Sequence, residues 1–304
     1  MPNSRFIEQV RLLVAILPHV AAQPCFALKG GTALNLFVHD LPRLSVDIDL
    51  AYLPVAGREE SLDGIDAALA AIESAITRSL PDATVSHALL KGTRWRMKLL
   101  VTQGGVAVKV EVTPVLRGSV YPAVERDLAP LAQAEFGHVR MRLLSFEDLY
   151  GDKLCAALDR QHPRDLFDVR LLLAGEGLTL RLKDAFLVYL LGHNRPMSEL
   201  LAPIRKDIAP LYAEEFIGMT REPVGLDELL AVRESLVAAV RAALTEADRQ
   251  FLLAVKRGDA DWSGFPIPVA ERLPAVRWKL ENLGRMEAAK RRLALTALER
   301  ALYG

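Results

Sequence analysis

The chain has 304 residues, of which 51% are hydrophobic, and it carries 38 basic and 38 acidic side chains. This composition supplies a large core and excludes an intrinsically disordered chain. A formal charge of zero argues against a protein that coats polyanions, so any nucleic-acid contact must use a local patch. No run reaches the roughly 18 apolar residues of a membrane span, and the first residues lack a signal-peptide layout. We therefore expect a cytoplasmic protein without a membrane segment.

Short strands and helices are expected to alternate along the first half of the chain. Apolar residues at helical spacing predict a first helix over 4–17, and 25–29 has the pattern of a short strand. A turn at Gly30-Gly31-Thr32 then opens a helical run, and 46–52 alternates as a strand. Further along, the pattern predicts a surface helix over 58–80 and strands at 83–90, 94–100, 106–112 and 138–142.

The periodicity changes at Ser145, where a Ser-x-x-Asp capping box predicts the start of a helix that ends at His162-Pro163. Almost everything beyond has helical spacing, with helices expected at 164–175, 180–191, 226–244, 246–256 and 274–302. The sequence therefore predicts an α+β unit with a mixed sheet over residues 1–175, followed by an all-helical domain over residues 176–304.

Two aspartates in the strand at 46–52 are candidate metal ligands. Because side chains alternate along a strand, Asp47 and Asp49 project from one face, about 6.6 Å apart, while Val46, Ile48 and Leu50 enter the core. Two such oxygen donors suit Mg²⁺, which takes one or two protein carboxylates together with substrate phosphates. A solvated strand face is the alternative interpretation.

Two further patterns add to this candidate site. Lys29-Gly30-Gly31-Thr32 lies at a strand-to-helix junction, where bare backbone N–H groups can hold phosphates, although a tight turn explains paired glycines equally well. In the strand at 106–112, Lys109 and Glu111 share one face. If this strand neighbours the first, Glu111 becomes a third carboxylate that a cation must compensate. The alternative is a surface ion pair between Lys109 and Glu111.

In the helical half, Lys153 lies mid-helix among apolar residues, so its ammonium could reach a phosphate. Asp168 shares a helix face with Arg164 and Asp165 and could orient Lys153 or a substrate hydroxyl. The alternatives are a solvent-facing lysine and a helix-surface partner of Arg164.

Two basic stretches are candidates for RNA contact. Residues 91–98 place four basic side chains around Trp95, which suits phosphates with a base stacked on the indole. Residues 271–304 contain eight basic and four acidic side chains. We take Arg94, Arg96 and Arg285 as representative contacts, with a solvated protein face as the alternative.

Residues 26–52 resemble the signature of the AbiEii/AbiGii toxin family, which includes MenT-like toxins of bacterial toxin–antitoxin pairs. The shared features are the Gly-Gly-Thr-Ala-Leu and Arg-x-Ser-x-Asp-x-Asp motifs, here carried by Gly30, Gly31, Thr32, Arg43, Ser45, Asp47 and Asp49. The Lys-x-Glu strand, residues 152–169 and residues 273–286 also look like later motifs of the family. The resemblance spans nearly the whole chain.

The resemblance implies a DNA polymerase β-type nucleotidyltransferase fold and a site for Mg²⁺ or Mn²⁺ and a nucleoside triphosphate. It implies that Asp47, Asp49 and Glu111 hold metal, that Lys153 neutralises phosphate charge, and that Asp168 holds Lys153 or the acceptor. The residues implied near the triphosphate are Gly30, Gly31, Thr32, Ser45 and Lys153.

The acceptor implied by the resemblance is the 3′ end of tRNA, whose blocking stops translation, with a cognate antitoxin as partner. Three alternatives stay open. The enzyme could nucleotidylate a protein or small molecule, the protein could bind nucleotide without any transfer, or it could be a DNA-binding regulator. Neutral charge and the lack of a short helix-turn-helix disfavour the regulator.

Overall fold

The computed structural model describes residues 4–304, which fold into two compact units. The first unit contains the chain up to Ser145 together with Ile217–Pro223, and the second contains Phe146–Phe216 and Val224–Gly304. The boundary predicted at residue 175 lies within the helical unit of this division. Helices 146–160 and 163–174 are grouped with the later helices because they pack against them, so the division falls where the strand pattern stops.

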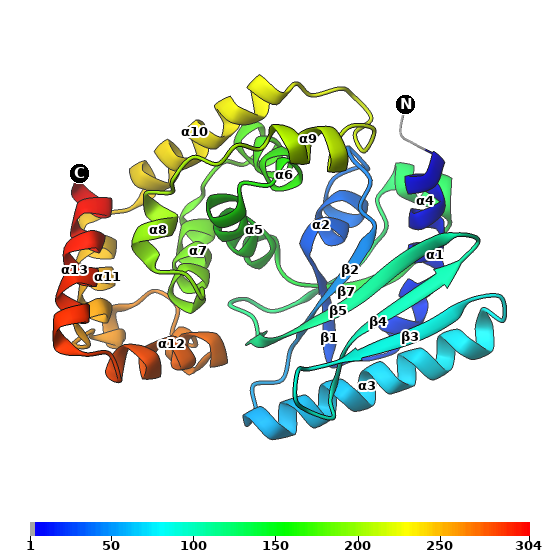
Figure 1. Cartoon of the computed structure of the whole chain (residues 1–304), viewed down its shortest axis with the longest axis horizontal. Helices are drawn as coiled ribbons and strands as arrows, with labels where there is room; N and C mark the ends of the chain where they lie inside the picture. The colour runs from blue at the N-terminus through cyan, green and yellow to red at the C-terminus, as the bar shows by residue number, and fades with distance from the viewer. Residues whose placement is uncertain (1–3) are drawn as a thin grey trace. The chain divides into compact units, whose positions relative to one another are not determined.

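The first unit is built on a mixed seven-stranded sheet within residues 4–304, in the order β3-β4-β5-β2-β1-β7-β6 (Figure 1). Strand β2 is parallel to β5 and β1 is parallel to β7, and the remaining neighbours are antiparallel. The strands are β1 (Phe26–Lys29), β2 (Asp47–Tyr52), β3 (Thr84–Leu89), β4 (Arg96–Gln103), β5 (Val106–Arg117), β6 (Val124–Asp127) and β7 (Arg140–Leu143). The predicted mixed-sheet α+β class is confirmed.

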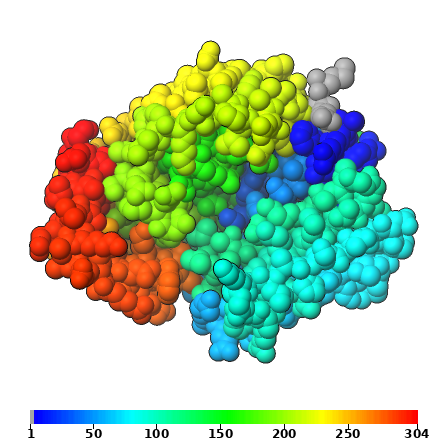
Figure 2. All heavy atoms as spheres, viewed as in Figure 1, coloured from blue at the N-terminus to red at the C-terminus, as the bar shows by residue number. Residues whose placement is uncertain are grey.

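Two long helices, α1 (Ser4–Ala21) and α3 (Arg58–Ser79), pack against each other and cover one face of the sheet. Their apolar stripes and the inward side chains of the strands form the core, because that burial removes apolar surface from water. In Figure 2 the outer surface of α3 and of strands β3 to β5 is the cyan and blue-green region. The fully buried core residues of this layer include Leu13, Leu17, Ile48, Leu50, Ile65, Leu69, Leu99, Val101, Val108 and Val110.

Short elements complete the first unit. Helix α2 (Gly30–Ala33) continues directly into a π-helical turn over Leu34–Val38, and α4 (Pro130–Phe136) follows β6. The segment 217–223 pairs with the loop before β2 through a bridge between Arg43 and Thr220 and a hydrogen bond from the Leu44 amide to the Met219 carbonyl, 2.8 Å. This pairing supports the chain immediately before β2.

The second unit is helical, as predicted. It contains α5 (Phe146–Arg160), α6 (Pro163–Ala174), α7 (Leu180–Gly192), α8 (Met197–Leu201), α9 (Ala209–Glu215), α10 (Leu226–Ala243), α11 (Glu246–Arg257), α12 (Pro274–Gly284) and α13 (Ala288–Tyr303). The capping box between Thr245 and Asp248 at the start of α11 is present, with both reciprocal bonds. Among residues 4–304, no helix has the length and apolar character needed to span a membrane.

Two predicted helices differ from the structure by more than one residue, and the strand expected at 106–112 continues to Arg117. The first helix continues past Pro18 to Ala21, because buried Val20 anchors the last turn although proline removes one hydrogen bond. The single helix expected over 274–302 is divided into α12 and α13, and the Arg291 guanidinium binds carbonyls of Leu283 and Gly284 at the break.

Strand β1 offers a test of the core. Leu28 is fully buried between β2 and β7, whereas Leu100 on β4 is 43% exposed. Leu28→Ala should lower the free energy of unfolding by about 2–5 kcal/mol, because it removes transfer free energy and leaves a cavity. Leu100→Ala is the matched control and should cost far less. Urea denaturation measures both, and equal losses would contradict the sheet assignment.

Candidate functional site

The open face of the central strands carries a set of charged side chains. Asp47 and Asp49 project from β2 while Ile48 between them is buried, as alternation predicts. The parallel register places Asp47 opposite Lys109 and Asp49 opposite Glu111 on β5. The predicted condition that the two strands are neighbours is met, and Glu111 therefore lies beside the β2 aspartates.

The same row extends to the outer strands. Antiparallel pairing places Lys29 of β1 opposite Asp49, and Lys98 of β4 opposite Glu111. Across four strands the order is therefore lysine, aspartate, glutamate, lysine. We call these four residues, together with Asp47 and Lys109, the charged row.

Two lysines hold the third carboxylate of the charged row. Lys109 Nζ lies 3.1 Å from Glu111 Oε2 and 3.9 Å from Asp47 Oδ1, and Lys98 Nζ lies 3.2 Å from Glu111 Oε1. The Lys109–Glu111 ion pair, which was the alternative interpretation of this strand, is therefore present. The predicted position of Glu111 beside the two aspartates is found as well. Both oxygens of Glu111 have cationic partners, so this side chain is not a vacant ligand.

These contacts change proton affinities in opposite directions. Burial alone would raise the pKa of Glu111, but Lys109 and then Lys98 outweigh it, so the pKa is lowered. Burial alone would lower the pKa of Lys109, but Asp47 and then Glu111 outweigh it, so the pKa is raised. Both groups are therefore fully charged at neutral pH.

The glycine turn lies directly against the aspartates. Gly30 has a φ of +73°, and a Cβ atom on it would lie 2.6 Å from Asp49 Oδ2. A Cβ atom on Gly31 would lie 2.7 Å from Arg43 Nη2 and 2.9 Å from Ser45 Oγ. Only glycine fits at these two positions without displacing a polar side chain, so the turn brings backbone close to a carboxylate.

Thr32 and Ser45 connect this turn to the start of β2. The buried Thr32 hydroxyl donates to the carbonyl of Asp47 at 2.5 Å, and its oxygen lies 3.0 Å from Ser45 Oγ. These contacts fix the strand end that carries the aspartates. Thr32 and Ser45 therefore have a positioning role here, and their predicted contact with a triphosphate stays a prediction.

The arrangement can be tested against a divalent cation. Among the described residues, no group of three or more His, Cys, Asp or Glu side chains is placed to hold a metal ion. Asp47 and Asp49 nevertheless supply two oxygen donors on one face, which fits Mg²⁺ bound by two carboxylates, water and substrate phosphates. The predicted contribution of Glu111 would require it to exchange a lysine for the metal.

Lys153 and Asp168 belong to the helical unit, where they form a buried ion cluster. Lys153 Nζ lies 2.8 Å from Asp165 Oδ1 and 2.9 Å from Asp168 Oδ2, and all three residues are at most 6% exposed. Arg160 Nε also contacts Asp165 at 2.5 Å. The structure brings Lys153 and Asp168 together, as expected, and neither is a surface group. Their catalytic roles stay predictions.

The predicted RNA-contacting arginines have acidic partners. Arg94 pairs with Asp63 at 3.0 Å, and Arg96 pairs with Asp66 at 3.2 Å and Glu73 at 3.3 Å. Arg285 is exposed and lies 3.9 Å from Glu281, one helical turn away. The Trp95 indole also donates to Asp63, at 2.7 Å. These contacts tie the 91–98 run to α3, and RNA binding by these arginines stays a prediction.

Lys98, Arg43 and Asp165 are among the residues of these sites that were not chosen from the sequence as site residues. The position of Lys98 beside Glu111 could not be predicted, because strand register depends on contacts between distant segments. Arg43 was visible only as a motif position, although it is buried against the glycine turn. Asp165 had a usable signal, since it lies three residues before Asp168 and therefore on the same helix face.

Comparison with known structures identifies the class of fold. The chain is similar to MenT4, a nucleotidyltransferase toxin from Mycobacterium tuberculosis, with a TM-score of 0.54 and 16% sequence identity over 97% of this chain and 93% of that one. At this identity the similarity shows the fold alone, and the chain shares the fold of MenT4.

Comparison of the sequence with protein families gives the particular assignment. Residues 11–282 match the family described as nucleotidyl transferase AbiEii toxin of a type IV toxin–antitoxin system. The chain therefore belongs to the AbiEii toxin nucleotidyltransferase family, and an antitoxin partner is implied. No curated protein matches the chain.

The buried ion cluster predicts a pH-dependent stability. Burial alone would raise the pKa of Asp165, but Lys153 and then Arg160 hold it far below its ordinary value. Stability from this depressed pKa is present above the unfolded pKa of about 3.9 and is lost as pH falls toward the folded value.

Asp165→Asn should therefore lower the free energy of unfolding at pH 7 by about 3–5 kcal/mol, as for a broken buried ion pair. The difference from wild type should shrink as the pH falls below about 4, because only the wild type loses this term on acidification. Urea titrations at pH 7, 4 and 3 measure it. A difference that stays constant or widens in acid would contradict this account of the cluster.

Proposed function

We propose that the protein transfers a nucleotide from a nucleoside triphosphate to the 3′ end of tRNA with Mg²⁺ or Mn²⁺, and so blocks translation. The observation that carries the proposal is the contact between the Gly30 turn and the Asp49 carboxylate, with Asp47 on the same strand face. Bare backbone beside two carboxylates can receive a triphosphate and its cation together.

In this proposal the carboxylates of the charged row and the glycine turn have distinct tasks. Asp47 and Asp49 would hold the metal, which when bound would neutralise triphosphate charge and polarise the α-phosphate. Gly30 and Gly31 would let phosphate oxygens approach backbone N–H groups. Glu111 forms ion pairs with both Lys109 and Lys98, so its proposed task is to position these lysines near the phosphates.

The proposed reaction forms one bond and breaks one. The 3′-hydroxyl oxygen of the acceptor attacks the α-phosphorus, and the bond from that phosphorus to the bridging oxygen breaks. Pyrophosphate leaves with the electron pair of the broken bond, and the hydroxyl proton passes to water. Positioning and charge stabilisation would supply most of the rate in such a transfer.

A different acceptor remains the main alternative. Because Arg94 and Arg96 have acidic partners on α3, the structure offers less support for RNA contact along 91–98 than the sequence did. A protein or a small molecule as acceptor would require no such contact. The transfer experiment below distinguishes these acceptors.

Asp47→Asn tests the transfer directly. The substitution keeps the side-chain shape and removes the charge, so nucleotide addition should fall on the order of a hundred- to a thousand-fold. Purified protein is incubated with total tRNA and each α-labelled nucleoside triphosphate in turn, and the labelled products are resolved on a gel. Asp82→Asn, in an exposed turn, is the matched control and should label as wild type.

Undiminished labelling of tRNA by Asp47→Asn would reject this mechanism. Label in protein or in a small molecule would move the acceptor to the alternative. Nucleotide binding without any covalent product would support a binding protein without transfer activity. Lys153→Ala and Asp168→Asn in the same assay test whether the buried cluster of the helical unit is needed for activity, with folding checked by circular dichroism.

Metal binding is tested without turnover. Mn²⁺ with a non-hydrolysable triphosphate analogue should raise the Tm of the wild type. When the ligand is at a hundredfold excess over Kd, the free energy of unfolding should increase by about 2.7 kcal/mol. Asp49→Asn should lose this stabilisation. The absence of a nucleotide-dependent metal effect, or an unchanged effect in Asp49→Asn, would count against the site.

A further inference from the structure

A buried arginine lies against the glycine turn of the first unit. Arg43 is 3% exposed, and its Nη2 atom would lie 2.7 Å from a Cβ atom on Gly31. Its Nη1 atom donates to the carbonyl of Leu44 at 2.9 Å. The guanidinium is therefore held by its own loop and faces the backbone of the turn, where a triphosphate is proposed to bind.

A segment from later in the chain holds the residues on both sides of this arginine. Residues 217–223 lie between α9 and α10 in the sequence, but they belong to the first unit, and we call them the supporting segment. The Leu44 amide donates to the Met219 carbonyl at 2.8 Å, and the Arg221 amide donates to the Pro42 carbonyl at 3.0 Å. Backbone hydrogen bonds therefore fix the loop directly before and directly after Arg43.

The supporting segment is itself anchored to the first unit. The Met219 side chain is buried, and Arg221 Nη2 lies 3.1 Å from Glu135 Oε2 on α4. Burial of the methionine contributes more to this anchoring than the partly exposed ion pair does. The loop before β2 thus rests on a segment that is distant in the sequence.

A second set of contacts joins this loop to the glycine turn. Leu41 has a φ of +56°, a left-handed conformation that a side chain of this size rarely adopts, and it is buried. Its amide donates to the Asn35 carbonyl at 3.0 Å, and the Asn35 side chain donates to the Gly31 carbonyl at 2.9 Å. Such a backbone conformation persists only where the surrounding contacts hold it. The loop and the turn are therefore fastened to each other.

We propose that Arg43, held by the supporting segment, is a positioning residue of the nucleotide site. It keeps the Gly31 backbone in place beside Asp47 and Asp49, so that triphosphate and metal can be held together. This role rests on the proposed function, because it concerns the same site. If the turn moves, both carboxylates remain, but phosphate oxygens lose their approach to the backbone N–H groups. The first loss is therefore expected in the affinity for triphosphate with metal.

Arg43→Gln tests this role in the full-length protein. Titration calorimetry with Mn²⁺ and a non-hydrolysable triphosphate analogue measures the affinity at a temperature where every variant is folded. Arg43→Gln should weaken binding about tenfold or more, because the turn loses a support that is held by a charged hydrogen bond. Arg43→Lys keeps the charge but not the planar fork of donors, so its binding should remain weak.

A second buried arginine is the control for loss of stability. Arg117 is 8% exposed in the same unit and donates to the Arg58 carbonyl at 3.4 Å. It pairs with Tyr52, at the opposite end of β2 from Asp47. Arg117→Gln should lower the Tm, because buried packing is lost, and should leave the affinity for the triphosphate analogue unchanged.

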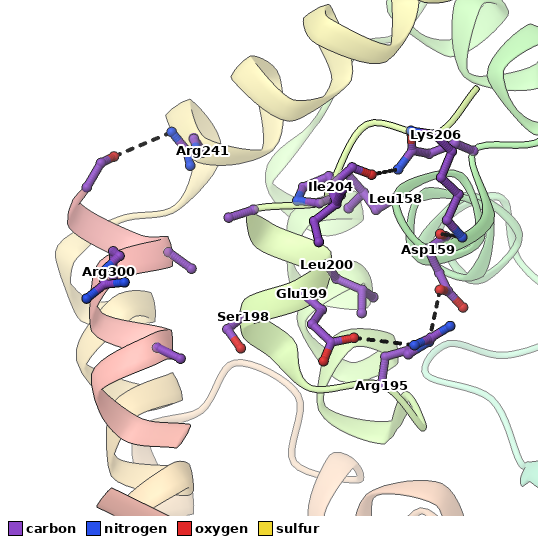
Figure 3. A pocket seen from close by; sticks show the side chains of 16 residues that line it. Leu158, Asp159, Arg195, Ser198, Glu199, Leu200, Ile204, Lys206, Arg241 and Arg300 are labelled. Carbon is purple, nitrogen blue, oxygen red and sulfur yellow. Dashed lines mark hydrogen bonds and ion pairs between the residues drawn. The ribbon is translucent and has the colours of Figure 1, made fainter. Parts of the chain in front are cut away.

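An arginine of the helical unit is the control for net charge (Figure 3). Arg195 lines a hollow of about 550 Å³ and pairs with Asp159 at 3.3 Å and with Glu199 at 3.5 Å. Arg195→Gln removes one positive charge, as Arg43→Gln does, but from the other unit. The affinity for the triphosphate analogue should not change.

A pair of substitutions tests the supporting segment. Arg221→Pro removes the amide that donates to Pro42, whereas Arg221→Ala keeps this amide and removes only the side chain. Amide hydrogen exchange over residues 30–33 and 42–46 should become faster in Arg221→Pro and in Arg43→Gln, but not in Arg221→Ala or Arg117→Gln. Mass spectrometry of peptides measures this exchange without metal or nucleotide.

Different results would contradict the proposed site and the role of Arg43. A wild type that does not bind Mn²⁺ with the analogue would overturn the proposed site and this role with it. A wild type that binds, with Arg43→Gln no weaker than Arg117→Gln, would overturn the role of Arg43 alone, and so would full recovery of affinity in Arg43→Lys. Equal exchange in Arg221→Pro and Arg221→Ala would overturn the role of the supporting segment.

Discussion

The parallel pairing of β2 with β5 is the constraint on which the site depends. This register places Asp47 against Lys109 and Asp49 against Glu111, and the neighbouring antiparallel strands add Lys29 and Lys98. A slip of one residue in β2 would turn both aspartates into the core and bring Ile48 to the surface. The buried core under the sheet therefore also determines the chemistry on its open face.

The charged row contains three carboxylates and three lysines, so a metal ion must compete with a lysine for the aspartates. Three carboxylates on one sheet face would repel each other, but three lysines lie among them, and Lys109 contacts both Asp47 and Glu111. A divalent cation that binds Asp47 and Asp49 must compete with this ammonium. A triphosphate would help, since its negative charge gives the displaced lysine a new partner. Metal and nucleotide should therefore bind cooperatively.

The helical unit places its charges differently. Around Lys153, two carboxylates and Arg160 form a compensated buried cluster. The stability of the helical unit should therefore depend on keeping every partner of this cluster.

Local sequence pattern was sufficient to predict much of this structure. Contacts between segments that are distant in the sequence could not be predicted in this way. The alternation at 46–52 and 106–112 was sufficient to predict which carboxylates share a face, because side-chain direction in a strand is local. The partners Lys98, Asp66 and Glu73 were not predictable, because they depend on strand order and on how α3 packs.

Some helix ends were likewise predictable from local pattern, and others depend on long-range contacts. The start of α11 agrees with the helix expected at 246–256, but the break between α12 and α13 depends on Arg291 reaching back to Leu283 and Gly284. The short elements β6, α4, α8 and α9 had too few residues to show a period. Within this chain, then, the longer elements were predictable from local pattern, whereas most contacts between elements were not.

The central claim is that Asp47 and Asp49 hold the metal of a nucleotide site beside the Gly30 turn. The most direct measurement is a crystal structure with Mn²⁺ and a non-hydrolysable triphosphate, with an anomalous map calculated at the manganese edge. The account predicts a manganese peak in contact with the carboxylates of Asp47 and Asp49, with the triphosphate against Gly30 and Gly31. Manganese and triphosphate bound elsewhere, with Lys109 still paired to Asp47 and Glu111, would contradict it.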